Sequence, residues 1–268
     1  MQIELDYPFE SKPRYGHGKP VHPELYRILN DGRAHYTRNL KEFATFASDL
    51  SSVPVSRPGD SADPFWDNGY FSGLDAFALH GFLSATNPGT YLEIGSGNST
   101  KFACYSIRKR NLQTRIISVD PNPRAEIDAI CSQIIRQPLE ALNLDIFQRL
   151  ESDSIVFFDG SHRSFMGSDV TVFYLEVLPR LQPGVLVQMH DILLPHDYHP
   201  DWTERYYSEQ YLLAALLIGG YKGWKIELPV TFVWQDNELL ETAAAAWPHR
   251  PRGADLHGVS FWMRRIQS

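Results

Sequence analysis

Residues 90–100 read TYLEIGSGNST: an apolar run of strand length, a loop with two glycines, and residues that can begin a helix. Glycine lets the backbone pass close to a bound ligand, and such a loop is informative when a strand precedes it and a helix follows. In open α/β sheets, ligands bind at the carboxyl ends of the strands, near the point where the strand order reverses. The stretch therefore predicts a binding loop at one end of a sheet.

Strand and helix patterns alternate on the C-terminal side of this loop. Strands are expected at 115–119, 132–136, 154–158, 185–189, 229–234 and 258–263. Helices are expected at 72–85, 100–108, 126–131, 166–178 and 208–218, with an alanine-rich helix between the last two strands. This alternation predicts an α/β fold of three layers, in which a mainly parallel sheet carries helices on both faces.

The N-terminal part of the chain has a different pattern. Residues 1–20 are rich in proline and glycine and predict an irregular arm, residues 22–50 have helical spacing, and residues 51–69 predict a loop. We therefore expect an N-terminal arm and helical cap over residues 1–70, followed by one ligand-binding domain over residues 71–268.

Composition narrows the class of protein. The 268 residues are 43% hydrophobic with a net charge of −7, which excludes general disorder and argues against a broad nucleic-acid-binding surface. The two cysteines, Cys104 and Cys131, lie in apolar stretches and predict buried thiols. Residues 1–19 are polar, and no apolar run approaches the ~18 residues of a membrane span. We expect a cytoplasmic enzyme without a membrane or nucleic-acid partner.

The details of the loop argue against a dinucleotide. The spacing is G-x-G-x-S, without a third glycine, and Glu93 stands two residues before Gly95. A carboxylate there repels a pyrophosphate but attracts the cationic end of an amino acid. Asp120, at the end of the next strand, can accept both hydroxyls of a ribose. Unless the two acids are incidental, they describe a pocket for a nucleoside with a positively charged tail.

These residues resemble the class I S-adenosylmethionine-dependent methyltransferases. LEIGSGNST looks like the first motif of that family and SVDPNP like the second, and the resemblance runs from Thr90 to the C-terminus. It implies a seven-stranded sheet in which a final hairpin brings one antiparallel strand. It also implies that residues 137–140 face the adenine and that residues 68–71 fold over the methionine end. The cofactor-binding residues that it implies are Glu93, Gly95, Ser96, Gly97, Ser99, Asp120 and Asp159.

Two further strand ends carry carboxylates and imidazoles. The strand at 154–158 is followed by Asp159 and His162, and the strand at 185–189 by His190 and Asp191. The two strands are expected to be neighbours, so these side chains should converge beside the cofactor. Such a cluster can hold a divalent cation or remove a proton from an attacking hydroxyl.

The tetrad DGSH at 159–162 resembles that of metal-dependent sugar O-methyltransferases of macrolide biosynthesis. The resemblance implies that Asp159 binds magnesium, with His190 and Asp191 as further ligands, and that His162 is the general base. The families usually place acids or an amide where His190 stands. Imidazole is a poorer ligand for magnesium than a carboxylate is. A site for manganese, iron or zinc, or a site without any metal, therefore stays open. So do non-ligating roles: Asp159 as a turn residue, His162 as an exposed loop histidine, and His190 as a partner that orients Asp191.

The sequence thus predicts methyl transfer from S-adenosylmethionine to a small-molecule acceptor, most simply at oxygen, with His162, Asp159 and Asp191 as the catalytic group. Residues 193–207, rich in aromatic side chains, are either a substrate lid or a surface loop packed on the cap. The alternatives are N-methylation without a metal and a non-catalytic nucleoside-binding protein. A homo-oligomer also stays open, because the N-terminal arm could exchange between subunits.

Overall fold

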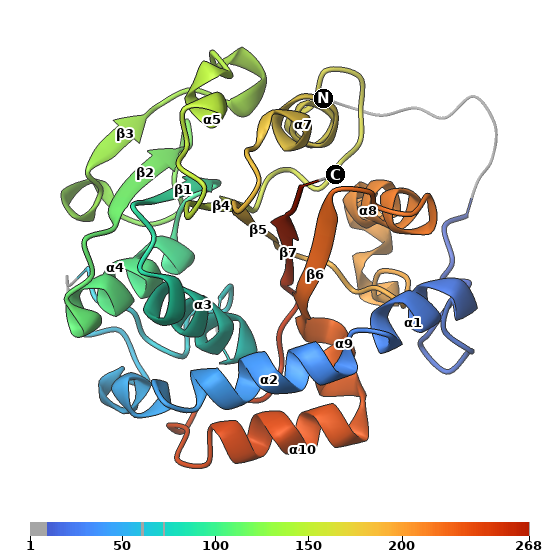
Figure 1. Cartoon of the computed structure of the whole chain (residues 1–268), viewed down its shortest axis with the longest axis horizontal. Coiled ribbons are helices and arrows are strands. Elements are labelled where there is room, and N and C mark those ends of the chain that lie inside the picture. The colour runs from blue at the N-terminus through green and yellow to red at the C-terminus, as the bar shows by residue number, and fades with distance from the viewer. Residues whose placement is uncertain (1–9, 60–61, 72, 268) are drawn as a thin grey trace.

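The computed structural model describes residues 10–59, 62–71 and 73–267. At its centre lies a seven-stranded sheet in the order β3-β2-β1-β4-β5-β7-β6 (Figure 1). The strands are β1 (Thr90–Ile94), β2 (Arg115–Val119), β3 (Gln133–Ile135), β4 (Ile155–Phe158), β5 (Leu186–Met189), β6 (Trp224–Pro229) and β7 (Phe261–Arg265). β1 to β5 are mutually parallel, whereas β7 runs antiparallel to both β5 and β6. The mainly parallel sheet and its one antiparallel strand confirm the predicted fold of class I methyltransferases.

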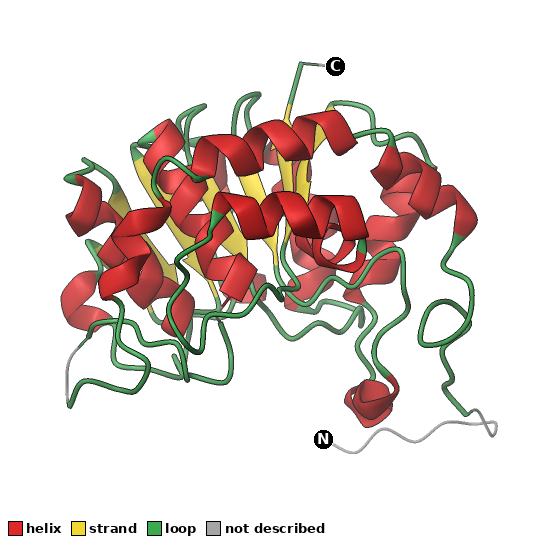
Figure 2. Cartoon of the chain, turned by 90° about the horizontal axis from the view of Figure 1, so that it is seen from below, coloured by secondary structure: helices red, strands yellow, loops and turns green. Residues whose placement is uncertain are grey.

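Helices cover both faces of this sheet, and β4 shows why. Its residues are buried, and successive side chains of a strand point to opposite faces. Phe157 meets Phe71 on one face, at 5.8 Å between ring centroids, and Phe158 stacks on Phe173 on the other, at 4.0 Å. Figure 2 shows the layer of helices over one face. The longer helices are α1 (Pro23–Asn30), α2 (Arg33–Phe43), α3 (Gly73–Thr86), α4 (Asn98–Arg110), α8 (Glu209–Ile218) and α10 (Asn237–Ala246).

The two N-terminal helices pack at different places, and α2 lies in the same layer as α3 (Figure 1). Helix α2 packs against α3, α10 and the edge strand β6, and α1 packs against α8. Figure 1 shows α2 and α10 side by side. A single hydrophobic core runs from Leu25 in α1 to Met263 in β7. The division of the chain at residue 70 stays a prediction. In the described residues, no helix has both the length and the apolar character that crossing a bilayer requires.

Near the C-terminus one expected strand is wrong and another is shifted. Residues 230–235 form helix α9 (Val230–Gln235), although the β-branched run predicted a strand, and the sixth strand is the preceding segment, β6. Tertiary contacts override the local preference: the Thr231 hydroxyl donates to the Ile192 carbonyl at 2.8 Å, and Phe232 packs on Tyr26. The last strand also begins later than expected, at Phe261.

Two helices in the middle of the chain also differ from the expectation. Only a single 3-10 turn, Asp128–Ile130, forms within 126–131. The helix expected at 166–178 begins three residues later, because Ser168 accepts a hydrogen bond from the Thr171 amide and starts α6 (Asp169–Val172). A π-helical turn (Phe173–Val177) follows, then α7 (Leu178–Arg180). The wider turn changes which side chains face inward: Leu175 is 71% exposed, whereas Phe173 and Leu178 are buried.

Candidate active site

A cavity of about 430 Å³ opens at the carboxyl ends of β1 and β4. The strand order reverses between these strands, which is where open α/β sheets bind ligands. The predicted cofactor residues Gly95, Ser96, Gly97, Ser99, Asp120 and Asp159 all line it. Pro138, Leu139 and Glu140 form another part of the wall, and Tyr70 and Phe71 a further one. The structure therefore brings the loop, the second strand end and the fourth strand end together around one cavity.

The two glycines of the loop are required for different steric reasons. Gly95 has φ +80°, and a Cβ atom there would lie 1.9 Å from the Asp159 carbonyl oxygen. The backbone of Asp159 therefore leaves no room for a side chain at this position. Gly97 is extended, and a Cβ atom there would contact only the Arg124 Cβ, at 4.0 Å, among the described residues. Because Gly97 lines the cavity, a larger side chain would fill part of the space that a ligand needs.

Glu93 does not line the cavity. Its side chain is fully buried beneath the loop, where the hydroxyls of Ser99 and Thr100 donate to its two oxygens and the Tyr91 hydroxyl donates at 3.3 Å. Burial raises the pKa of Glu93 to about 8 despite these hydrogen bonds. The Glu93 side chain thus holds the start of α4 against β1, and its role in cofactor binding stays a prediction.

Asp120, in contrast, faces the cavity with a carboxylate that is fixed on its other side. One oxygen accepts from the Ser96 amide at 2.8 Å and the other from the Asn122 amide at 2.7 Å. A carboxylate oxygen can accept more than one hydrogen bond, so both can still receive donors from the cavity. This geometry suits a pair of neighbouring hydroxyls.

The predicted catalytic side chains converge at the edge of the cavity. His162 Nε2 lies 3.1 Å from an Asp159 oxygen and 3.4 Å from an Asp191 oxygen. His162 is only 4% exposed, which contradicts the alternative of an exposed loop histidine. Its backbone is in the left-handed region, at φ +60°, as is that of Asp191, at φ +55°. Two non-glycine residues in this uncommon conformation indicate that the surrounding structure fixes the site.

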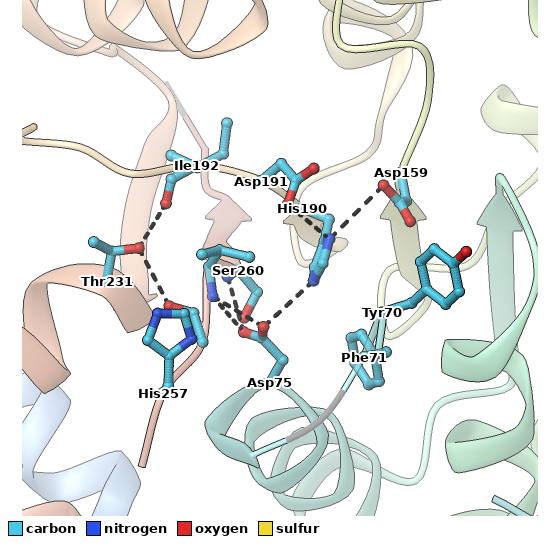
Figure 3. A network of polar contacts seen from close by, with 12 residues as sticks. Tyr70, Phe71, Asp75, Asp159, His190, Asp191, Ile192, Thr231, His257 and Ser260 are labelled. Atoms are coloured by element: carbon cyan, nitrogen blue, oxygen red, sulfur yellow. Dashed lines mark hydrogen bonds and ion pairs between the residues drawn. The ribbon is translucent and has the colours of Figure 1, made fainter. Parts of the chain in front are cut away.

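His190 lies beside this group but is turned toward a different partner (Figure 3). Its Nδ1 is 3.5 Å from an Asp191 oxygen and 3.8 Å from an Asp159 oxygen, and its Nε2 is 3.3 Å from the buried Asp75. Asp75 also accepts hydrogen bonds from the Val259 and Ser260 amides, at 2.9 Å each. His190 is therefore held between α3 and the strand ends.

Two carboxylates of the cluster, Asp75 and Glu209, were missed in the sequence. Each stands in the first turn of a helix and is followed by apolar residues. An acid in that position ordinarily favours the helix dipole, so neither position by itself indicates a buried acid. In the structure Glu209 is fully buried, and its Oε2 lies 2.9 Å from His162 Nδ1.

The cluster therefore contains four carboxylates and two imidazoles. Burial would lower the pKa of both histidines, but the neighbouring carboxylates reverse the effect: the pKa of His190 rises to about 9, and that of His162 lies well above its ordinary value. Burial would raise the pKa of Asp159, but the two imidazoles hold it below its ordinary range. Burial raises the pKa of Glu209 to about 7 and also raises the pKa of Asp191, so full ionisation of the four acids is unfavourable without a further positive charge.

The donor set fits a divalent cation. Asp159, His162 and Asp191 each offer one ligand atom, and these atoms lie within 4.8 Å of one another. His162 rather than His190 completes this set, which differs from the expected ligands Asp159, His190 and Asp191. Two carboxylate oxygens and one imidazole nitrogen can act as ligands of manganese, iron or zinc as well as of magnesium.

The segment at 193–207 closes over one side of the cluster. Tyr207 packs on the His162 ring at 4.5 Å, and Trp202 packs on Tyr207 at 5.8 Å. Asp197 accepts hydrogen bonds from the Arg14 and Tyr15 amides, at 2.6 and 2.8 Å. The segment thus packs on the N-terminal arm and also contacts the candidate base.

Comparison with known proteins identifies the class. Residues 92–192 match a family model described as a methyltransferase domain. That range begins in β1 and ends just after Asp191, so it includes the glycine loop, Asp120 and the cluster. With the fold of class I methyltransferases, the match defines this part of the chain as a methyltransferase domain. The protein is an S-adenosylmethionine-dependent methyltransferase, and the alternative of a non-catalytic binding protein is set aside.

Several solved structures are similar in fold. A methyltransferase from Podospora anserina bound to S-adenosylhomocysteine is 14% identical over 94% of this chain and all of that chain, with a TM-score of 0.45. An O-methyltransferase from Bacillus cereus is 11% identical over 92% of each chain, with a TM-score of 0.42. MycE, a methyltransferase of mycinamycin biosynthesis in complex with Mg, is 16% identical over 67% of this chain and 45% of its own, with a TM-score of 0.40. Likenesses at this level do not identify a substrate. A search of curated proteins gives no match to this chain.

Proposed function

We propose that this protein methylates a hydroxyl group of a small molecule and that His162 is the general base. The observation that carries the proposal is the position of His162 Nε2, 3.1 Å from the Asp159 carboxylate that also lines the cofactor cavity. A base at this point is next to the cavity and can reach an acceptor hydroxyl placed there. An amine acceptor needs no buried base of this kind once its lone pair is free, so the geometry favours oxygen over nitrogen.

The cavity wall supports specific roles in cofactor binding. Asp120 would accept the ribose hydroxyls, Gly97 would leave room for the amino-acid end, and Leu139 and Glu140 would lie beside the adenine. When bound, S-adenosylmethionine supplies the methyl group: a carbon–oxygen bond forms as the carbon–sulfur bond breaks, and the electron pair stays on sulfur. The protein orients the acceptor, and His162 takes the proton that leaves the hydroxyl.

A divalent cation bound by Asp159 and Asp191 is a second part of the proposal. The excess of carboxylates over imidazoles supports it, because a cation would compensate charges that burial makes unfavourable. Such an ion would polarise an acceptor oxygen. His162 Nε2 is also within reach of the same space, so ligation by His162 would compete with its role as base.

Replacement of His162 by alanine tests the proposed base. We expect unchanged binding of S-adenosylmethionine by calorimetry, and transfer to phenolic or sugar test acceptors reduced by ~10²–10⁴-fold. The wild-type rate should rise with pH above about 6.5, because the carboxylates raise the pKa of His162 and the ring must lose its proton before it can act. His249→Ala, on an exposed turn after α10, is the matched control. Wild-type transfer by His162→Ala would remove the base, and transfer to amines alone would favour N-methylation.

Chelation tests the cation. If Asp159 and Asp191 hold a divalent metal, dialysis against a chelator should abolish most of the transfer, and Mg²⁺ or Mn²⁺ should restore it. Asp191→Asn should raise the metal concentration needed for half-maximal rate, because an amide is a weaker ligand than a carboxylate. Transfer that is equally fast with and without chelator would remove the metal from the proposal and leave His162 in place.

A further inference from the structure

Glu209 is a buried carboxylate with very few partners. It is the first residue of α8, its side chain has no exposed surface, and its Oε2 lies 2.9 Å from His162 Nδ1. Its other oxygen, Oε1, has no hydrogen-bond partner among the described residues. Burial raises the pKa of the Tyr174 hydroxyl and the nearby carboxylate contributes to this rise, but the Tyr174 hydroxyl donates to the Met189 sulfur, at 3.0 Å.

Such a group is unfavourable for folding. A carboxylate removed from water loses its hydration, and one hydrogen bond from an imidazole does not replace the interactions of both oxygens. Asp75, the other buried acid of the cluster, differs in this respect, because backbone amides of Val259 and Ser260 also donate to it. Asp75 joins α3 to the residues just before β7, whereas no backbone amide donates to the Glu209 carboxylate among the described contacts, and its closest bond is to the ring of His162.

The same turn of α8 also fixes the backbone of His162. The amides of Ser208 and Glu209 donate to the His162 carbonyl, at 2.8 and 3.2 Å. These bonds hold the residue in its left-handed conformation while the Glu209 carboxylate holds the ring. Backbone and ring are thus both oriented from one helix start.

The charge of Glu209 has a consequence for the ring. A carboxylate beside Nδ1 favours the neutral tautomer with its hydrogen on Nδ1, and the lone pair is then on Nε2. Asp159 and Asp191 favour the opposite tautomer, but they lie farther from the ring, at 3.1 and 3.4 Å, and their side chains are 26% and 16% exposed, whereas Glu209 is fully buried at 2.9 Å. In this structure Nε2 faces Asp159 and Asp191, on the side of the cofactor cavity. The lone pair is directed to the place where an acceptor hydroxyl would lose its proton.

We propose that Glu209 is a positioning residue that sets the tautomer and the orientation of His162. The proposal deepens the proposed function, because it rests on His162 as the base. It assigns the carboxylate to the chemistry of the site and not to the stability of the fold.

Two variants and one control test it. Glu209→Leu removes the carboxylate at similar volume, Glu209→Gln keeps an acceptor without the charge, and Asp75→Asn is the control for a carboxylate with structural bonds. We expect Glu209→Leu to keep or increase the free energy of unfolding in urea, and Asp75→Asn to lower it. Transfer to the phenolic or sugar acceptor used by the wild type should fall about 10- to 100-fold in kcat for Glu209→Leu, with KM and cofactor affinity nearly unchanged. Glu209→Gln should be intermediate.

The tautomer is measured separately, by two-bond ¹H–¹⁵N correlation spectra of the histidine rings at a pH where His162 is neutral. We expect Nδ1–H in the wild type and a mixture in Glu209→Leu. If Glu209→Leu keeps both the wild-type tautomer and the wild-type kcat, the proposal is overturned. It is also overturned if Glu209→Leu loses as much stability as Asp75→Asn while its folded fraction has a normal kcat. If no hydroxyl acceptor reacts even with the wild type, the proposed function fails, while the tautomer still decides the role of Glu209.

Discussion

Two acidic residues beside the glycine loop differ in whether their carboxylates reach the cavity. Glu93 is buried beneath the loop with both oxygens occupied by hydroxyl groups of its own chain. Asp120 is held by two backbone amides and still lines the cavity. The difference follows from strand geometry, since Glu93 lies within β1, whereas Asp120 follows the last residue of β2.

Asp120→Ala should therefore weaken binding of S-adenosylmethionine. Charge-assisted hydrogen bonds contribute roughly 1.5–3 kcal/mol, so the dissociation constant measured by calorimetry should rise about 10- to 100-fold. Glu241→Ala, which removes an exposed carboxylate of α10, controls for the change in net charge. Unchanged affinity in Asp120→Ala would mean that the ribose lies elsewhere.

At the scale of elements, helix α2 is attached to the edge strand β6 through one buried carboxylate. Glu227 is bonded by the His35 ring and by Arg264 Nε, the latter at 3.1 Å, and Lys225 Nζ lies 3.5 Å away. The Asn39 side chain also donates to the Glu227 carbonyl, at 2.9 Å. Helix α2 thus occupies one backbone acceptor of the edge strand, which limits pairing with another chain at that point.

Glu227→Gln should lower the free energy of unfolding at pH 7 by about 1–3 kcal/mol. Burial would raise the pKa of Glu227, but its bond with His35 and its cationic neighbours hold it below the ordinary value of 4.5. The stabilisation is therefore complete above pH 4.5 and is lost as the pH falls through the pKa of the folded state. Urea unfolding at pH 7 and pH 3 should show a large difference between variant and wild type at pH 7 and a small one at pH 3. An equal difference at both pH values would contradict this account.

For the whole molecule, the important feature is that the first helices share the core of the sheet. Leu25, Leu29, Tyr36, Leu40 and Phe43 are buried. Phe43 packs on Phe82 at 4.8 Å, and Phe82 packs on Trp262 of β7 at 4.5 Å. The contacts thus run without interruption from α2 through α3 to the sheet.

A chain that begins at residue 54 should lose cooperative folding. Removal of a single large buried side chain costs about 2–5 kcal/mol, and the deletion removes the five named above together with Ile28, Leu50 and Val53 from a domain whose net stability is of the order of 5–15 kcal/mol. Thermal unfolding should lose its sharp transition, whereas a chain that begins at residue 21 should keep it. A sharp transition at an unchanged temperature in the shorter chain would show that the N-terminal helices are a separate cap.

Local patterns were sufficient for the central strands and for the glycine loop. Strands β1, β2, β4 and β5 lie where apolar, β-branched runs predicted them, because these strands are buried on both faces and their sequence reflects it. The sequence also predicted that Asp159, His162, His190 and Asp191 would meet, since adjacent parallel strands end at one edge of the sheet. Helix α9 was missed, because its β-branched residues are held by contacts with Ile192 and Tyr26 that are distant along the chain.

The orientation of the candidate catalytic side chains was decided by the tertiary structure. No pattern near His162 indicates that its Nδ1 faces Glu209, 47 residues further along the chain, or that His190 is turned toward Asp75, 115 residues before it. A residue type and its place at a strand end are local properties, and the sequence determined them by itself. Burial, partners and the direction of a ring depend on which distant helices pack over that strand end, and only the folded chain brings those helices together.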